Sequence, residues 1–173
     1  MLSSSAKERW ITPALFVFFG LDFMISEPAA IAQSRRLSLE DLAKSSDVIV
    51  MGRIDKISSQ ATPNGTNITT QIEVTVIEQW KGPRRSSVII NQPGGSAGEL
   101  TQAVPGTPQF TVGEETILFL KGSRNGLYRV VGNRQGKILV KTDPQTQEQI
   151  TQELSGKTQP LDEFVKNLER VLR

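Results

Sequence analysis

The stretch ITTQIEVTVIEQW, residues 68–80, decides the fold class of this protein. Apolar and β-branched side chains recur at almost every second position, and mostly polar ones lie between them. Because successive side chains of a strand point to opposite faces, this period of two predicts a long, half-buried strand. The side chains that share its patterned face are Ile68, Thr70, Ile72, Val74, Val76, Glu78 and Trp80.

Shorter segments of the same kind precede and follow this strand. Clusters of Gly, Pro, Asn and Asp separate them, which is typical of an all-β sandwich or barrel. The last three strands are predicted to form a meander with turns at GSRNG and GNRQG, and TDPQTQEQITQ (142–152) a polar edge or loop. The further predicted strands are residues 48–57, 86–92, 115–121, 127–131 and 137–141, with 99–104 as an additional candidate.

Helical patterns lie at both ends of this β-rich region. In LSLEDLAKSSD, Ser38 is placed to cap a short helix, with Asp41 three residues later as in a capping box. Residues 160–172 carry apolar side chains on one helical face, with acidic residues near the start and basic residues near the end. The sequence therefore predicts a mainly β fold: a small antiparallel barrel with a short N-terminal helix and an amphipathic C-terminal helix.

The first 32 residues have the composition of a secretory signal peptide. Lys7 and Arg9 precede an apolar run at residues 10–25, and small residues follow it. An A-x-A site ending at Ala30 and Ala32 predicts cleavage before Gln33. We therefore expect an exported protein, periplasmic or extracellular, whose residues 33–173 form a single domain.

An uncleaved membrane anchor is the alternative for this segment. The apolar run is short beside the roughly 20 apolar residues that span a bilayer. It also contains Asp22, and a charge at the centre of a membrane helix costs about 2.5–3.5 kcal/mol on insertion scales. Cleavage is the favoured prediction, and it leaves no stable membrane span.

The composition restricts the possible chemistry. The chain contains no histidine and no cysteine. It therefore has no Ser-His-Asp or Cys-His catalytic group, no histidine or cysteine zinc site and no disulfide. Its 20 basic and 18 acidic residues are scattered rather than gathered in a basic stripe, so charge does not indicate a nucleic-acid partner. We predict no catalytic residue, no metal and no cofactor.

The segment NQPGGSAGEL contains the spacing G-x-S-x-G, with Gly94, Gly95 and Ser96 at its centre. A nucleophile elbow also needs a following helix and a base, whereas Pro105 comes too soon for a helix and no histidine exists. We interpret residues 93–108 as a long glycine- and proline-rich loop, and such loops often carry binding functions. A hydrolase that uses Ser96 with a lysine base, or a pair of carboxylates, is the alternative.

A second candidate site lies at the end of the long strand. Trp80 is followed by Arg84 and Arg85, a combination that could stack on a glycan or a single-stranded nucleic acid. Packing of Trp80 in the core or at its rim is the competing interpretation.

Several motifs together resemble a known family. They are LSLEDLAKSSDVIVMGRI, TTQIEVTVIEQWKG, a glycine pair followed by GTPQFTVGEETILFLK, and YRVVGNRQGKILV. The chain resembles a family of uncharacterised exported bacterial proteins, and its implied shape is similar to the oligonucleotide/oligosaccharide-binding (OB) barrel of netrin-like and metalloproteinase-inhibitor domains. That resemblance implies an OB-like barrel of five to seven strands. The zinc-chelating amino-terminal cysteine of such inhibitors has no counterpart at Gln33, so inhibition is not implied.

The sequence thus favours an exported, non-enzymatic binding domain of unknown ligand, with an envelope or extracellular protein as its expected partner. The candidate contact residues are Trp80, Arg84, Arg85, Gly94, Gly95 and Ser96.

Overall fold

The computed structural model describes residues 36–173 except 64 and 123–125. All of these belong to the second of two compact units, Arg35–Arg173. The predicted signal peptide, with Ala30, Ala32 and Gln33, lies outside the described residues. Within the described part of the chain, no helix is long and apolar enough to cross a membrane.

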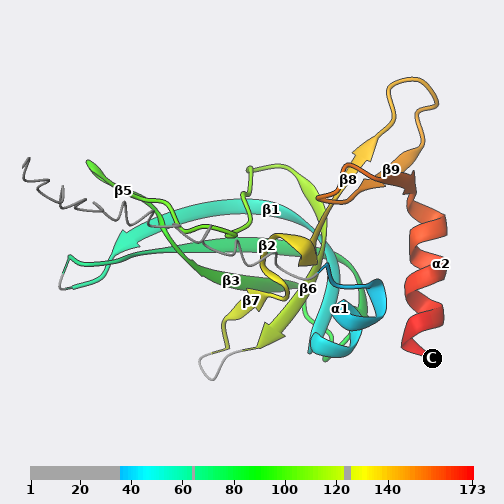
Figure 1. Ribbon diagram of the computed structural model, residues 1–173, viewed down its shortest axis with the longest axis horizontal. Coiled ribbons are helices and arrows are strands. Elements are labelled where there is room, and N and C mark those ends of the chain that lie inside the picture. Colours follow the sequence, from blue (N-terminus) through cyan, green and yellow to red (C-terminus); the bar gives the residue numbers. More distant parts are fainter. Residues whose placement is uncertain (1–35, 64, 123–125) are drawn as a thin grey trace, which may run out of the picture. The chain divides into compact units, whose positions relative to one another are not determined.

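Five strands close into a barrel, which confirms the predicted mainly β fold (Figure 1). Neighbouring strands pair in the order β1-β2-β3-β7-β6, and β6 returns to β1. All these pairs are antiparallel except β3 with β7, which is parallel. Closure of five strands in this order gives the OB-type barrel. The strands are β1 (Val48–Ala61), β2 (Ile68–Lys81), β3 (Ser87–Pro93), β6 (Glu115–Gly122) and β7 (Tyr128–Val130).

The predicted meander at the end of the barrel is wrong, because β7 and β8 (Lys137–Thr142) do not pair with each other. Both pair with the same edge of β6: Tyr128 lies opposite Gly122, and Lys137 lies opposite Leu118. Residues 132–136, predicted to be a hairpin turn, leave this edge as an excursion that contains the short 3-10 helix η1 (Asn133–Gly136). β7 and β8 are therefore one return strand with an insertion.

Residues 142–152, predicted to be a polar edge or loop, contain a strand. β9 (Gln149–Gln152) pairs with β8, and β10 (Thr158–Pro160) pairs with β9. The buried residue of this strand is Thr151, and Ile150 is its one apolar residue, so the strand has almost no apolar signal in the sequence. The backbone amide of Gln145 donates to Asp143 Oδ1 at 2.7 Å, which stabilises the turn that leads into β9.

The predicted long loop at 93–108 is also partly ordered as a hairpin of β4 (Gly95–Ala97) and β5 (Leu100–Gln102). β5 corresponds to the additional strand candidate at 99–104. The amide of Gly94 donates to the Ile68 carbonyl at 2.8 Å, and the Gln102 side chain accepts from the Ile68 amide at 2.7 Å. These bonds fasten the hairpin to the start of β2.

Two apolar cores lie on either side of the barrel wall. The inner core fills the barrel and includes Ile72, Val74 and Leu118. The outer core lies between the wall and the two helices, α1 (Leu39–Ser45) and α2 (Leu161–Leu172). Figure 1 shows α2 beside α1 and β9, and the residues of these elements are in contact.

Both predicted helices are confirmed. Ser38 caps α1 and forms the expected capping box with Asp41. In α2, Phe164 and Leu168 are the fully buried side chains. Burial of each contributes roughly 1.5–3 kcal/mol relative to exposure, which holds α2 against the outer core.

Candidate functional site

The structure does not bring Trp80, Arg84 and Arg85 together in one groove. Trp80 packs against the outer core near the helices, and its indole Nε1 is buried with no hydrogen-bond partner among the described residues. The Arg85 guanidinium instead lies over the Tyr128 ring, 5.7 Å from its centroid. Arg84 is exposed. Trp80 and Arg85 therefore contact different parts of the molecule.

Gly94, Gly95 and Ser96 line a small pocket of ≈ 320 Å³ where β4 contacts β1 and β2. A Cβ at Gly95 would lie only 2.2 Å from Thr70 Oγ1, so this position has no room for a side chain. The Ser96 hydroxyl is exposed and hydrogen-bonds the Thr101 hydroxyl at 3.0 Å. A second hydroxyl is not a general base, so this pair alone does not make Ser96 a nucleophile.

A larger hollow of ≈ 650 Å³, which we name the seam groove, lies between β3 and β7. One wall is residues 91–93 of β3. A second is Arg129 and Val130 of β7 with Val131 directly after them, and the third is residues 104, 105, 107 and 108. Ser45, Lys121 and Asn133 complete the lining.

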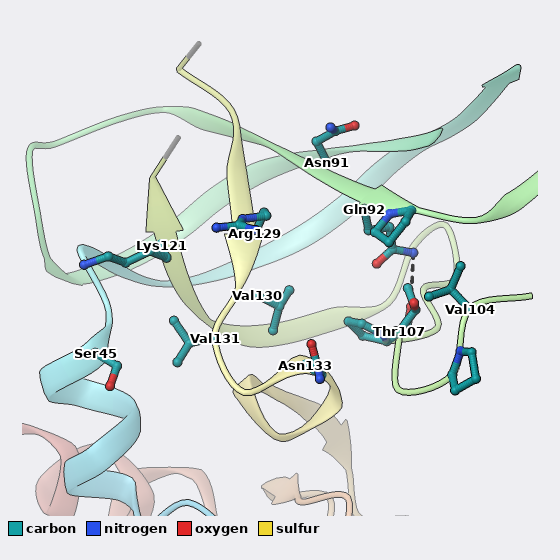
Figure 2. A pocket seen from close by; sticks show the side chains of 13 residues that line it. Ser45, Asn91, Gln92, Val104, Thr107, Lys121, Arg129, Val130, Val131 and Asn133 are labelled. Atoms are coloured by element: carbon teal, nitrogen blue, oxygen red, sulfur yellow. Dashed lines mark hydrogen bonds between the residues drawn. The ribbon is translucent and has the colours of Figure 1, made fainter. Parts of the chain in front are cut away.

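The seam groove forms because β3 and β7 pair only briefly. Their parallel ladder consists of one residue pair, Ile90 with Tyr128. Beyond this pair, several consecutive residues of each strand line the groove. Because consecutive side chains of a strand point to opposite faces, a hollow on one face of the wall would contact only every second residue. The hollow therefore enters the barrel wall between two strands. Figure 2 shows the Gln92 side chain extending from β3 toward Thr107, and Val130 of β7 on the same side of β3.

Two cations meet at one side of the seam groove. Lys121 and Arg129 lie directly opposite each other on β6 and β7. Like charges at opposite positions destabilise a sheet. Asp47 relieves part of this repulsion: its Oδ1 lies 2.8 Å from Lys121 Nζ, and its Oδ2 accepts from the Gly122 amide at 3.0 Å.

This arrangement leaves Arg129 as the free charge of the groove. Figure 2 shows the Lys121 side chain extending away from Arg129. The hydrogen bond from Lys121, followed by that from the Gly122 amide, holds the pKa of the Asp47 carboxyl below its usual value. Arg129 is exposed and forms no ion pair or hydrogen bond with any described residue.

Two buried amide oxygens of β3 residues that line the groove accept no hydrogen bond from the described residues, although Figure 2 shows the Asn91 side chain directed away from Gln92. Gln92 Nε2 donates to the Pro108 carbonyl at 3.2 Å, which fixes the orientation of the amide. Gln92 Oε1 and Asn91 Oδ1 are buried and accept no hydrogen bond from the described residues. A buried acceptor without a donor costs about 1–3 kcal/mol, so a ligand with N–H or O–H groups gains by binding here.

The groups that line the seam groove can bind a ligand. The described lining of the seam groove contains a free guanidinium, amide oxygens and apolar side chains, and it contains no carboxylate. The described residues also hold no group of three or more His, Cys, Asp or Glu placed to bind a metal ion. The groove can attract an anion and accept hydrogen bonds, while its lining offers no evident general base.

Sequence reasoning did not single out Arg129, Gln92 or Asn91. A hairpin closed by the predicted turn GSRNG would pair Lys121 with Leu127, whereas the structure pairs Lys121 with Arg129, so the position of Arg129 could not be predicted. The amides carried no signal either, because only the divergence of β3 from β7 buries their oxygens.

Comparison with known proteins adds no assignment, since neither a scan against protein-family models nor a search of curated proteins finds a match. We therefore infer the function from the geometry of the seam groove.

Proposed function

We propose that this protein is an exported, non-enzymatic binding domain that holds a protein or another envelope component in the seam groove. One observation carries this proposal: Arg129, which pairs with no described residue, and Gln92, whose Oε1 has no donor among the described residues, line the same hollow in the barrel wall. Export is proposed from the first 32 residues alone, which have the composition of a signal peptide.

Segment 93–108 supports the proposal because it forms one wall of the seam groove. The start of the segment is fixed to β2: Thr70 Oγ1 donates to the Gly94 carbonyl at 2.6 Å. Its end is fixed to β3 through the bond from Gln92 to Pro108. A wall that is already ordered needs little reorganisation on binding, which favours affinity.

Affinity capture from an envelope extract of the producing cells tests this proposal. We expect wild-type protein to retain a component that Arg129→Glu loses. Arg84→Glu is the matched control, because Arg84 is also exposed but lies outside the groove lining. Retention of the same components by both variants would contradict the groove assignment. Loss with Arg84→Glu alone would instead support the site near Trp80 and Arg85.

The alternative of a serine hydrolase at Ser96 has its own test. Because the Ser96 hydroxyl hydrogen-bonds the Thr101 hydroxyl, we expect no labelling by a serine-reactive fluorophosphonate. Labelling of the wild-type protein that disappears in Ser96→Ala, and persists in Ser87→Ala, would establish the enzyme instead.

A further inference from the structure

We infer that the seam groove takes an extended peptide segment that carries one carboxylate beside an aliphatic side chain. This inference depends on the proposed binding function and names the chemistry of its ligand. Three properties of the groove support it: its single free charge, its unpartnered acceptors and its apolar wall.

The positive charge of Arg129 favours a ligand with one carboxylate. Arg129 presents a planar guanidinium, whose donors match the two oxygens of a carboxylate. Lys121 is already paired with Asp47, so the described lining of the groove offers one uncompensated positive charge. A ligand with a single negative group matches this charge better than a polyanion does.

The amide oxygens call for donors, and a peptide main chain supplies one N–H at each non-proline residue. Gln92 Oε1 keeps its orientation because Nε2 of the same amide is bonded to the Pro108 carbonyl. Its oxygen has no donor among the described residues and is therefore open to an N–H of a ligand. The hollow of ≈ 650 Å³ falls within the roughly 300–1,000 Å³ of pockets that hold drug-sized ligands, so a few residues fit rather than a folded domain.

Part of the groove lining is apolar. Val104, Pro105 and Pro108 contribute to it from the connecting segment and Val130 from β7, and proline contributes no N–H. An aliphatic side chain next to the carboxylate would contact this lining and release water from it.

Two other ligand classes fit less well. Single-stranded nucleic acids stack their bases on aromatic rings and need several cations for the backbone. The described lining of the seam groove contains no aromatic side chain and one free cation. An anionic glycan would satisfy Arg129 and the amide oxygens, but its polar surface makes poor use of the valine and proline wall.

Selection from peptide libraries tests the inference. Random nonapeptides are displayed on phage in two formats, internal or with a free carboxyl terminus, and selected on the full-length purified protein. We expect enrichment of peptides with an acidic group next to Val, Leu or Ile. The format that enriches shows whether a side-chain or a terminal carboxylate is bound.

Fluorescence anisotropy of the enriched peptides then compares variants. We expect Arg129→Gln to weaken binding at least tenfold, Arg129→Lys to recover part of it, and Arg84→Gln to change it less than twofold. Because Arg129 is exposed, all variants should keep the thermal unfolding midpoint of the wild type. Enrichment without acidic residues, or equal affinity for Arg129→Gln, would overturn the inference.

Polygalacturonate and a 20-nucleotide oligothymidylate are the competing probes in the same assay. If either binds in an Arg129-dependent way and no peptide does, the peptide inference fails while the groove remains a binding site. If no probe depends on Arg129, the peptide inference also fails, and capture from the extract decides the proposed function separately.

Discussion

Lys137 illustrates at the residue scale how this protein stabilises a buried charge. Its ammonium lies 2.5 Å from Glu114 Oε1 and 4.6 Å from the centroid of the Phe110 ring, and it also donates to the Gln109 carbonyl. The Lys137 side chain is only 10% exposed. Burial lowers the pKa of Lys137, and the Glu114 carboxylate opposes that shift. One side chain thus connects β8 to the segment that leads into β6.

Replacing Lys137 with methionine should strongly destabilise the fold. The variant leaves the mostly buried Glu114 carboxylate without its cation, and breaking a buried pair costs about 3–5 kcal/mol. The double variant Lys137→Met with Glu114→Gln removes both charges and should recover much of that loss. Urea unfolding measures both free energies. A double variant no more stable than the single one would show that the ion pair is not the cause.

Asp47 should make the stability depend on acid pH. The pKa of Asp47 is lower in the folded state than in the unfolded state. Its contribution to the free energy of unfolding is therefore complete above the unfolded-state pKa near 3.8 and is lost as pH falls through the folded-state pKa. The pair with Lys121 is exposed, so the effect should stay below about 1 kcal/mol. Thermal unfolding midpoints between pH 2 and 6 should fall more steeply for the wild type than for Asp47→Asn. Parallel curves would contradict the assignment.

At the scale of elements, the insertion between β7 and β8 depends on glycine. A Cβ at Gly136 would lie 2.2 Å from the Val131 carbonyl oxygen, where no atom fits. At Gly122 the nearest atom would be 3.6 Å away, which is an ordinary contact. Neither residue has a positive φ angle, so the two positions differ mainly in space.

We therefore expect Gly136→Ala to destabilise the protein by about 1–3 kcal/mol, as overpacking does. Gly122→Ala should change the free energy of unfolding by less than about 0.5 kcal/mol, as surface substitutions usually do. Guanidinium unfolding of both variants makes the comparison. Equal effects would mean that the excursion can shift to accept a side chain.

The elements that the sequence predicted correctly are those whose own pattern identifies them. Residues 68–80 alternate strictly enough to mark β2, and Ser38 with Asp41 marks the start of α1. Strand pairing is different, because alternation says which face is buried and nothing about the partner strand. The excursion at residues 132–136 was therefore predicted to be a hairpin turn, and the polar stretch that contains β9 to be a polar edge or loop.

At the scale of the whole molecule, the seam groove could not be predicted, again because the pairing of distant strands leaves no local pattern. It exists where β3 and β7, far apart in sequence, separate after a single residue pair. Residues 93–108 were recognised as a candidate binding segment from their glycines and prolines, but not as a wall facing Arg129. Local composition indicated the segment, whereas the closure of the barrel created the site.

The central claim is that ligand binds in the seam groove, and site-specific photocrosslinking in producing cells tests it most directly. A benzoylphenylalanine replaces Pro105, an exposed groove residue, or Gln71, an exposed residue of β2 outside the groove lining. We expect a discrete adduct from position 105 that disappears when Arg129→Glu is added, and no such adduct from position 71. An adduct from position 105 that persists in Arg129→Glu, or one that forms equally from position 71, would contradict binding in the groove.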